Sequence, residues 1–211
     1  MNKHGAIILC GGKSSRMGSS KALLPIGQEV MLPRIVRIVS EVIPLEHIVV
    51  VSAADQKLPT LPDEVTITQD ARAERGPLEG LAAGLRTLTG KAETAFVTGC
   101  DVPLLKPEFI SHMFALLADN DIVVPKEGKF HHPLAAVYRT SVLQQVQHLL
   151  DDDQLRPLFL FEKVKTREVP VEDLRIIDAE LDSLLNCNNP DDYQQALRKV
   201  KGGMGDREPQ H

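Results

Sequence analysis

Residues 6–21 read AIILCGGKSSRMGSSK, a short apolar run followed by a loop of glycines and serines. The apolar residues 6–9 are typical of a buried strand. The loop carries cations, among them Arg16 and Lys21, and three glycines: Gly11, Gly12 and Gly18. Glycines let backbone N–H groups approach a ligand closely, and such amides together with fixed positive charges favour anions. The stretch therefore predicts a strand that leads into a binding loop for a nucleoside triphosphate.

Two common phosphate loops do not fit this stretch. A Walker A motif needs G-x-x-x-x-G-K-[ST], but here five residues separate Gly12 from Gly18, and Lys21 follows Gly18 by three. The dinucleotide motif G-x-G-x-x-G is absent as well. Two interpretations stay open from these residues alone: a phosphate loop of another type, and an ordinary surface loop with cations.

Strand-like and helix-like segments alternate along the rest of the chain. The expected strands are residues 6–9, 47–51, 65–68, 94–98, 121–124, 134–138 and 167–171. The expected helices are residues 32–42, 78–88, 107–117, 141–150, 154–161 and 191–199, with Ser141 as an N-cap. This alternation predicts an α/β fold with three layers, in which helices cover both faces of a mainly parallel sheet. We expect one domain over residues 1–200 and a disordered tail from Lys201.

Polar residues follow several of the expected strands. Ser52 follows the second strand, Asp70 the third and Asp101 the fourth. Ligands of such folds collect beyond the carboxyl ends of the strands, so these residues should share one rim with the loop at residues 11–21. Asp101 lies in TGCDVPLL, and a lone carboxylate at a strand end is a natural Mg²⁺ ligand. A turn or helix-capping role is the alternative, and the pairing with the loop favours the metal.

Two further segments each allow two interpretations. In RGPLEGLAAGL, Gly80 and Gly84 lie on one helical face and allow close approach of a base, although plain helix–sheet packing is favoured by spacing alone. In NCNNPD, Asn186 and Asn188 would face the same way in an extended segment and could bind a second ligand. The alternative is a helix-entry turn, with Asn189 as cap and the proline after it at the first helical position.

The neighbouring His131 and His132 would point to opposite faces of a strand, so they make a poor joint metal site. The cysteines Cys10, Cys100 and Cys187 form no C-x-x-C pair, and their odd number argues against a disulfide framework. We expect them to be small buried hydrophobes.

The composition is that of an ordinary globular protein. Hydrophobic residues make up 43% and charged residues 25%, and the formal net charge is −5, which argues against a broad nucleic-acid surface. No apolar run approaches the about 18–20 residues needed to span a bilayer, and the N-terminus lacks the apolar core of a signal peptide. We therefore expect a cytoplasmic protein without a membrane partner.

Six segments together resemble the molybdenum cofactor guanylyltransferases, within the nucleotidyltransferases with a Rossmann-like fold. They are LCGGKSSRMGSSK, QD at 69–70, GPLEGLAAGL, GCDVPLL, HHPLAAVY and NCNNPDDY, in the family's order from residue 9 to about residue 193. The double glycine at 11–12 and N-x-N-x-P at 186–190 look more like the guanylyltransferase branch than like relatives that use CTP.

The resemblance implies transfer of GMP from GTP to molybdopterin, with Mg²⁺ as cofactor. It implies GTP contacts at Leu9, Cys10, Gly11, Gly12, Lys21, Ser52, Asp70 and Asp101. Lys21, Arg16 and Asp101 would be catalytic, with Asp101 also holding Mg²⁺, while Asn186 and Asn188 would hold molybdopterin. Proteins that synthesise or accept the molybdenum cofactor are implied partners.

Three residues depart from the family pattern. Cys10 replaces the usual alanine, Ser52 stands where asparagine is common, and Glu79 puts a carboxylate where a small residue often stands. The rival functions are a cytidylyltransferase acting on molybdopterin or another phosphorylated acceptor, a nucleotide-binding regulatory module, and a structural α/β protein without a nucleotide. The intact Lys21, Arg16 and Asp101 argue against the regulatory module.

Overall fold

The computed structural model describes residues 3–11, 20–70 and 75–205. Its centre is an eight-stranded sheet with the order β10-β7-β9-β6-β1-β4-β5, in which β8 also pairs with β7. The strands are β1 (His4–Leu9), β4 (Ile48–Ser52), β5 (Thr66–Gln69), β6 (Thr94–Gly99), β7 (Ile122–Glu127), β8 (Phe130–His131), β9 (Ala135–Arg139) and β10 (Thr166–Pro170). The pairs β1·β4, β1·β6, β4·β5 and β7·β10 are parallel, whereas β9 runs antiparallel to β6 and β7. The predicted mainly parallel sheet is confirmed.

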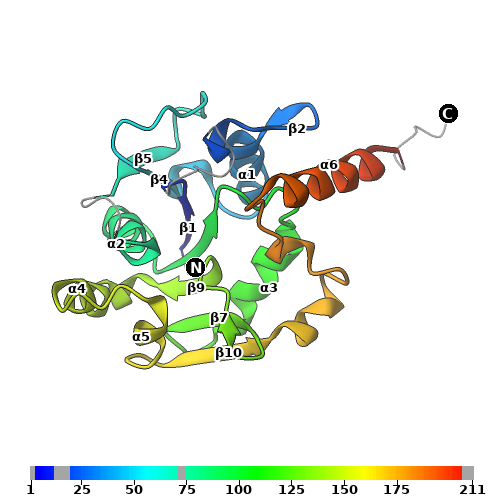
Figure 1. The fold of residues 1–211 in the computed structure, drawn as a ribbon. Coiled ribbons are helices and arrows are strands. Elements are labelled where there is room, and N and C mark those ends of the chain that lie inside the picture. Colours follow the sequence, from blue (N-terminus) through cyan, green and yellow to red (C-terminus); the bar gives the residue numbers. More distant parts are fainter. Residues whose placement is uncertain (1–2, 12–19, 71–74, 206–211) are drawn as a thin grey trace.

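Helices cover both faces of this sheet (Figure 1). They are α1 (Met31–Ser40), α2 (Pro77–Leu88), α3 (Pro107–Leu117), α4 (Leu143–Asp151), α5 (Pro157–Phe161) and α6 (Pro190–Gly205). In Figure 1, α2, α4 and α5 lie on one side of the sheet, and α1 and α3 lie on the other. A small hairpin of β2 (Pro25–Ile26) and β3 (Glu29–Val30) precedes α1.

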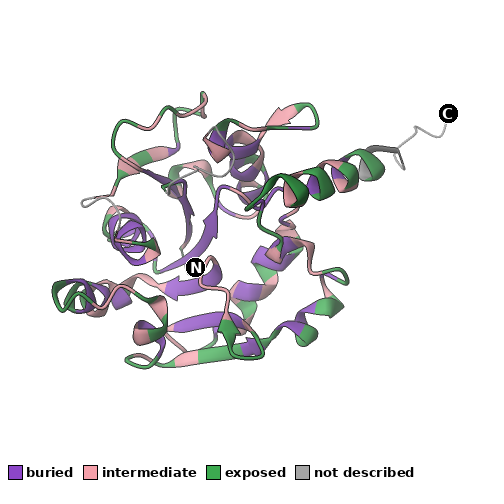
Figure 2. Cartoon of the chain, viewed as in Figure 1, coloured by how far each residue is buried: buried purple, intermediate pink, exposed green. Residues whose placement is uncertain are grey.

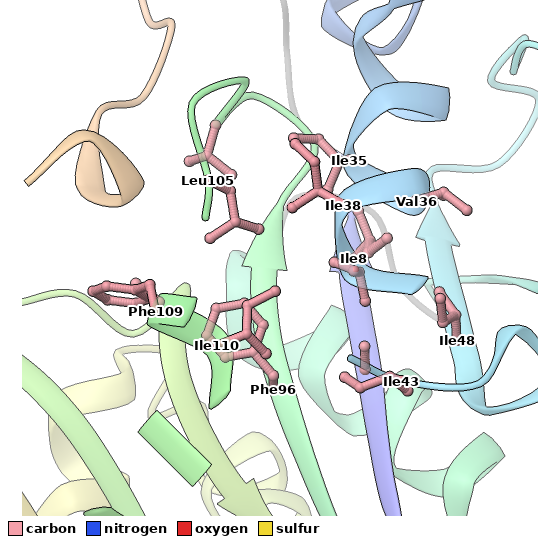
Figure 3. Close-up of a cluster of buried hydrophobic side chains, with 14 of the residues drawn as sticks. Ile8, Ile35, Val36, Ile38, Ile43, Ile48, Phe96, Leu105, Phe109 and Ile110 are labelled. Carbon is pink, nitrogen blue, oxygen red and sulfur yellow. The ribbon is translucent and has the colours of Figure 1, made fainter. Parts of the chain in front are cut away.

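The central strands are buried because both of their faces are apolar (Figure 2). Along β1 the side chains alternate between two clusters, with Ile7 packed in the cluster that includes α2 and Ile8 in the one that includes α1 and α3. Figure 3 shows the second cluster, where Ile8 meets side chains of α1 and where Phe96 of β6 lies close to Phe109 of α3. A continuous apolar run thus places β1 at the centre of the sheet, and the loop after it emerges at the middle of the rim.

The four-residue spacing of Gly80 and Gly84 reflects close packing of α2 on β1. A Cβ atom added to Gly84 would lie 2.5 Å from Cγ2 of Ile7, which is closer than van der Waals contact allows. This confirms helix–sheet packing as the role of Gly84.

We expect Gly84→Ala to lower the free energy of unfolding by about 1–2 kcal/mol. The overpacking against Ile7 costs more than the roughly 1 kcal/mol that alanine gains in a helix interior. Gly202→Ala is the matched control, since Gly202 is also helical but a Cβ there meets nothing within 4 Å. Urea unfolding of both variants measures the difference, and equal stability of Gly84→Ala and wild type would contradict this account of the packing.

Three local expectations are wrong. Helix α4 begins at Leu143 after a 3₁₀ turn at Thr140–Val142, so Ser141 lies inside that turn and caps nothing. The helix expected from residue 154 begins at Pro157, because the amide of Gln154 donates to the carbonyl of Leu149 and closes α4 instead.

Helix α6 continues to Gly205, so the tail expected from Lys201 is helical in its first five residues. Residues 206–211 lie outside the described chain. The pair Gly202-Gly203 favours a helix end, but no proline follows Pro190 before Gly205, and both glycines are taken into the helix.

None of the described helices is long and apolar enough to cross a membrane.

Candidate active site

The carboxyl ends of β1, β4, β5 and β6 lie side by side at one rim of the sheet, because these strands are adjacent and parallel. Backbone hydrogen bonds continue past the strand ends. The amide of Cys10 donates to Val51, that of Asp70 to Ser52 and that of Cys100 to Leu9, at 2.8, 3.1 and 3.0 Å. The predicted rim residues are therefore brought together on a rigid edge.

Lys21 joins Asp101 and Asn188 above this rim. Its Nζ donates to Oδ2 of Asp101 at 2.6 Å and to Oδ1 of Asn188 at 2.9 Å. The backbone amide of Cys187 donates to the carbonyl of Asp101 at 2.8 Å, which fixes the segment of Asn188 beside the end of β6. Asp101 and Asn188 follow Lys21 by 80 and 167 residues along the chain. A cation, a carboxylate and an amide thus meet at one point, and this cluster is the centre of the candidate site.

Two glycines make room for two carboxylates of the rim. A Cβ on Gly99 would lie 2.6 Å from Oδ1 of Asp101, and a Cβ on Gly11 would lie 2.8 Å from Oδ2 of Asp70. Any larger residue at either position would displace the carboxylate beside it. The carboxylate positions are therefore set by the backbone of the strand ends as well as by their own residues.

Asp70 occupies a half-buried position near α2. Burial, and next the nearby carboxylate of Glu79, raise the pKa of Asp70. Within the described chain, its Oδ1 is buried and accepts no hydrogen bond. Glu79 is also buried and has Nε of Arg75 3.6 Å from its Oε2. A donor from outside the described residues would satisfy the free oxygen of Asp70.

Ser52, Leu9 and Cys10 differ from the other rim residues because their side chains are buried. Leu9 and Cys10 are therefore placed to reach a ligand through backbone atoms, and a cysteine in place of the family's alanine leaves those atoms unchanged. The side chain of Ser52 is only 3% exposed, and its carbonyl is already used by Asp70.

Gln56 is a residue of the rim that sequence reasoning missed. Its Nε2 donates to the carbonyl of Cys10 at 3.1 Å and to Oγ of Ser20 at 3.2 Å, and its Oε1 accepts from the amide of Ala53. It therefore holds both described ends of the loop that follows β1. The only sequence signal was a polar residue four positions after the end of a strand. Gly12 and Arg16 lie outside the described residues.

The segment before α6 combines the two interpretations that the sequence left open. Oδ1 of Asn189 accepts from the amide of Asp192 at 2.9 Å, and Oδ2 of Asp192 accepts from the amides of Asn188 and Asn189, which is a reciprocal helix cap. The helix-entry role of Asn189 is confirmed, while the side chain of Asn188 faces Lys21.

The segment is not extended, because the amide of Asn188 donates to the carbonyl of Asn186 in a tight turn. Asn186 instead lines a small cavity with Leu104, Leu185, Cys187, Asp192, Gln195 and Ala196.

The three cysteines are free and buried, as predicted. Burial, and next the charges of Asp101 and Asp192, raise the pKa of Cys187 to about 12, so this thiol stays protonated at neutral pH. Among the described residues no group of three or more His, Cys, Asp or Glu side chains could hold a metal ion. A metal at this rim would therefore be held by fewer than three such side chains of the described chain, together with its substrate.

The fold and this rim define a nucleotide-binding α/β protein of the doubly wound class, with the ligand side at the carboxyl ends of the strands. The family model of the MobA-like NTP transferase domain matches residues 6–167, and the chain belongs to this family of nucleotidyltransferases. The predicted family is confirmed.

Curated relatives and solved structures agree with this assignment. The chain is 31% identical to the probable molybdenum cofactor guanylyltransferase of Methanosarcina mazei, over 95% of this chain and 92% of that protein. It is 30% identical to the molybdenum cofactor guanylyltransferase of Desulfosudis oleivorans, over 93% and 96% of the two chains. The fold matches molybdopterin-guanine dinucleotide biosynthesis protein A of Archaeoglobus fulgidus with a TM-score of 0.77 at 24% identity, over 94% and 99% of the chains.

Proposed function

We propose that this protein transfers GMP from GTP to the terminal phosphate of molybdopterin and releases pyrophosphate. The observation that carries the proposal is the meeting of Lys21, Asp101 and Asn188 at the rim. A nucleotidyl transfer needs a cation for the phosphates, a carboxylate for a metal and polar groups for the acceptor, and this cluster supplies all three. The names of the curated relatives support guanine and molybdopterin as the substrates.

The chemistry requires positioning more than proton transfer. An acceptor phosphate is already ionised at neutral pH, so no strong general base is needed, and the chain would act by orienting the two substrates and stabilising charge. Lys21 would exchange part of its contact with Asp101 for the phosphates of GTP and, with Arg16, would neutralise the charge that develops on pyrophosphate. Backbone amides of the loop that begins at Gly11 would hold the phosphates.

The residues fit a magnesium ion that arrives with the nucleotide. Mg²⁺ is usually held by one or two carboxylates together with waters and substrate phosphates, which matches a rim with one central carboxylate, Asp101. Asp101 would hold the ion, and Gly99 leaves the space that its carboxylate occupies. When bound, Mg²⁺ would polarise the α-phosphate of GTP.

Acceptor binding is assigned to the segment before α6. Asn188 already contacts Lys21, and Asn186 lines the cavity beside it. Because the amide of Cys187 is bonded to the carbonyl of Asp101, an acceptor held by these asparagines would lie next to the transfer centre.

Selective stabilisation by GTP is the test of this function. We expect saturating Mg-GTP to raise the free energy of unfolding by about 2.7 kcal/mol at 100 times Kd, and Mg-ATP, Mg-CTP and Mg-UTP to raise it less. Thermal unfolding with the four nucleotides in parallel measures this, and omission of Mg²⁺ should weaken the GTP effect. A preference for CTP would replace the proposal with a cytidylyltransferase, and no shift with any nucleotide would refute nucleotidyl transfer.

A further inference from the structure

One half of the ligand rim carries no residue of the proposed nucleotide set. Strand β6 is in the middle of the sheet, with β1, β4 and β5 on one side and β9, β7 and β10 on the other. The residues assigned to GTP follow β1, β4, β5 and β6. The acceptor must approach the α-phosphate from a side that the rest of GTP does not occupy. The half of the rim beside β9 and β7 is available for this approach.

His132 lies in this second half, close to the end of β6. Strand β9 runs antiparallel to β6, and Thr98 pairs with Ala135, so the residues just before β9 emerge at the same rim as the residues just after β6. Asp101 follows Thr98 by three residues, and His132 precedes Ala135 by three. Neighbouring strands lie about 4.8 Å apart, so the segment that leaves β6 and the segment that enters β9 begin side by side at this rim.

The backbone of His132 is fixed. Its amide donates to the carbonyl of Pro125 at 2.9 Å, and its carbonyl accepts from the amide of Ala135 at 3.1 Å. The turn therefore presents the imidazole from a rigid position rather than from a free loop end.

The two neighbouring histidines have different surroundings. Nε2 of His131 lies 2.7 Å from Oε1 of Glu168, and its ring packs against Phe161 of α5, so His131 is engaged within the fold. Nε2 of His132 is buried and has no hydrogen-bond partner among the described residues. Oε2 of Glu127 lies 3.8 Å from this nitrogen, which is beyond hydrogen-bond distance.

An unsatisfied buried nitrogen calls for an explanation. The side chain of His132 as a whole is 26% exposed, so a rotation of the ring that turns this nitrogen outward would let a bound ligand satisfy it. Burial is the main cause that lowers the pKa of His132. The carboxylate of Glu127 acts to raise this pKa, and the neighbouring His131 acts to lower it further. The imidazole is therefore neutral at pH 7 and offers one N–H donor and one acceptor nitrogen.

We propose that His132 is an acceptor-binding residue, which contacts the phosphate-bearing acceptor on the β9 side of the transfer centre. This inference rests on the proposed function and extends it from the segment of Asn186 and Asn188 to the opposite flank of Asp101. The chemical class of ligand is a phosphate monoester, whose oxygens accept from the imidazole N–H.

The test compares His132→Ala, His132→Gln and the matched control His131→Gln in the full chain. Steady-state kinetics with molybdopterin and Mg-GTP gives KM for each substrate, and thermal unfolding with Mg-GTP reports nucleotide binding separately. We expect His132→Ala to raise KM for molybdopterin about tenfold or more, as loss of one hydrogen bond to a charged group implies. KM for GTP and the thermal shift with Mg-GTP should stay near wild type. The side-chain amide of glutamine should restore part of the acceptor affinity, and His131→Gln should change neither KM.

The outcomes separate the two proposals. If wild type transfers GMP but His132→Ala keeps its KM for molybdopterin, the assignment of His132 is wrong and the proposed function stands. If His132→Ala raises both KM values alike, or loses its thermal shift with Mg-GTP, the residue supports the local fold and the assignment is again wrong. If wild type shows no GMP transfer to molybdopterin, the proposed function itself fails.

Discussion

Replacing Asp101 with alanine is expected to lower kcat by about 10²–10³ while the fold stays intact. The carboxylate is at the end of β6 and is 17% exposed, so its removal empties no part of the core. It takes away the ligand proposed for the metal and the partner of Lys21, and loss of one such electrostatic contact typically costs roughly 3 kcal/mol of barrier.

Lys21→Ala should lower kcat to a similar degree, since Lys21 is the described cation of the same cluster. Because the two side chains contact each other, the double variant should lose less activity than the sum of the single losses. Asp63→Ala is the control, since Asp63 is an exposed carboxylate in a turn away from the rim. Turnover of purified Asp101→Ala or Lys21→Ala close to that of wild type would remove the cluster from the mechanism.

The second large effect is on stability. Asp178 is fully buried and accepts from Nζ of Lys106 at 2.6 Å and from the amide of Ser183 at 2.7 Å. Oγ of Ser183 accepts in turn from the amide of Lys106, so the network ties residues 178–183 to the start of α3. Asp178→Ala leaves a buried amide without a partner, and we expect a loss of about 2–3 kcal/mol in the free energy of unfolding.

This contribution should depend on pH. Burial acts to raise the pKa of Asp178, but the ion pair with Lys106 and the hydrogen bonds from Ser183 outweigh it and hold the pKa below its usual value. A lowered pKa means that the stabilisation is present at neutral pH and is lost as the pH falls from about 4 through the folded-state value.

Urea unfolding of wild type and Asp178→Ala between pH 7 and pH 3 measures both effects. The difference between the two proteins should be largest at neutral pH and should shrink in acid. Asp119→Ala is the control, because Asp119 also pairs with a lysine but is 81% exposed, and its removal should change stability little. A difference that stays constant down to pH 3 would show that the charge of Asp178 contributes nothing.

Much of the fold was predictable because the signals are local. Apolar runs and helical spacing depend on residues within one or two turns of each other, so the order of strands and helices and the buried first strand follow from the sequence. The cap formed by Asn189 is equally local. The start of α4, in contrast, depended on which of two adjacent turns the chain adopted around Ser141. The length of α6 differed from the prediction because the helix continues through Gly202 and Gly203, where the local pattern favours an end.

By itself, the sequence determined that this is an α/β protein whose first strand leads into a glycine-rich segment with Arg16 and Lys21, and that Ser52, Asp70 and Asp101 follow strands. Only the tertiary structure decided that Lys21 meets Asp101 and Asn188, that Gly99 makes room for a carboxylate, and that Gln56 holds the loop. The physical reason is that these contacts depend on the order of strands in the sheet. The position of β1 between β4 and β6 joins residues far apart in the chain, and no local pattern records which strand will be the neighbour of another.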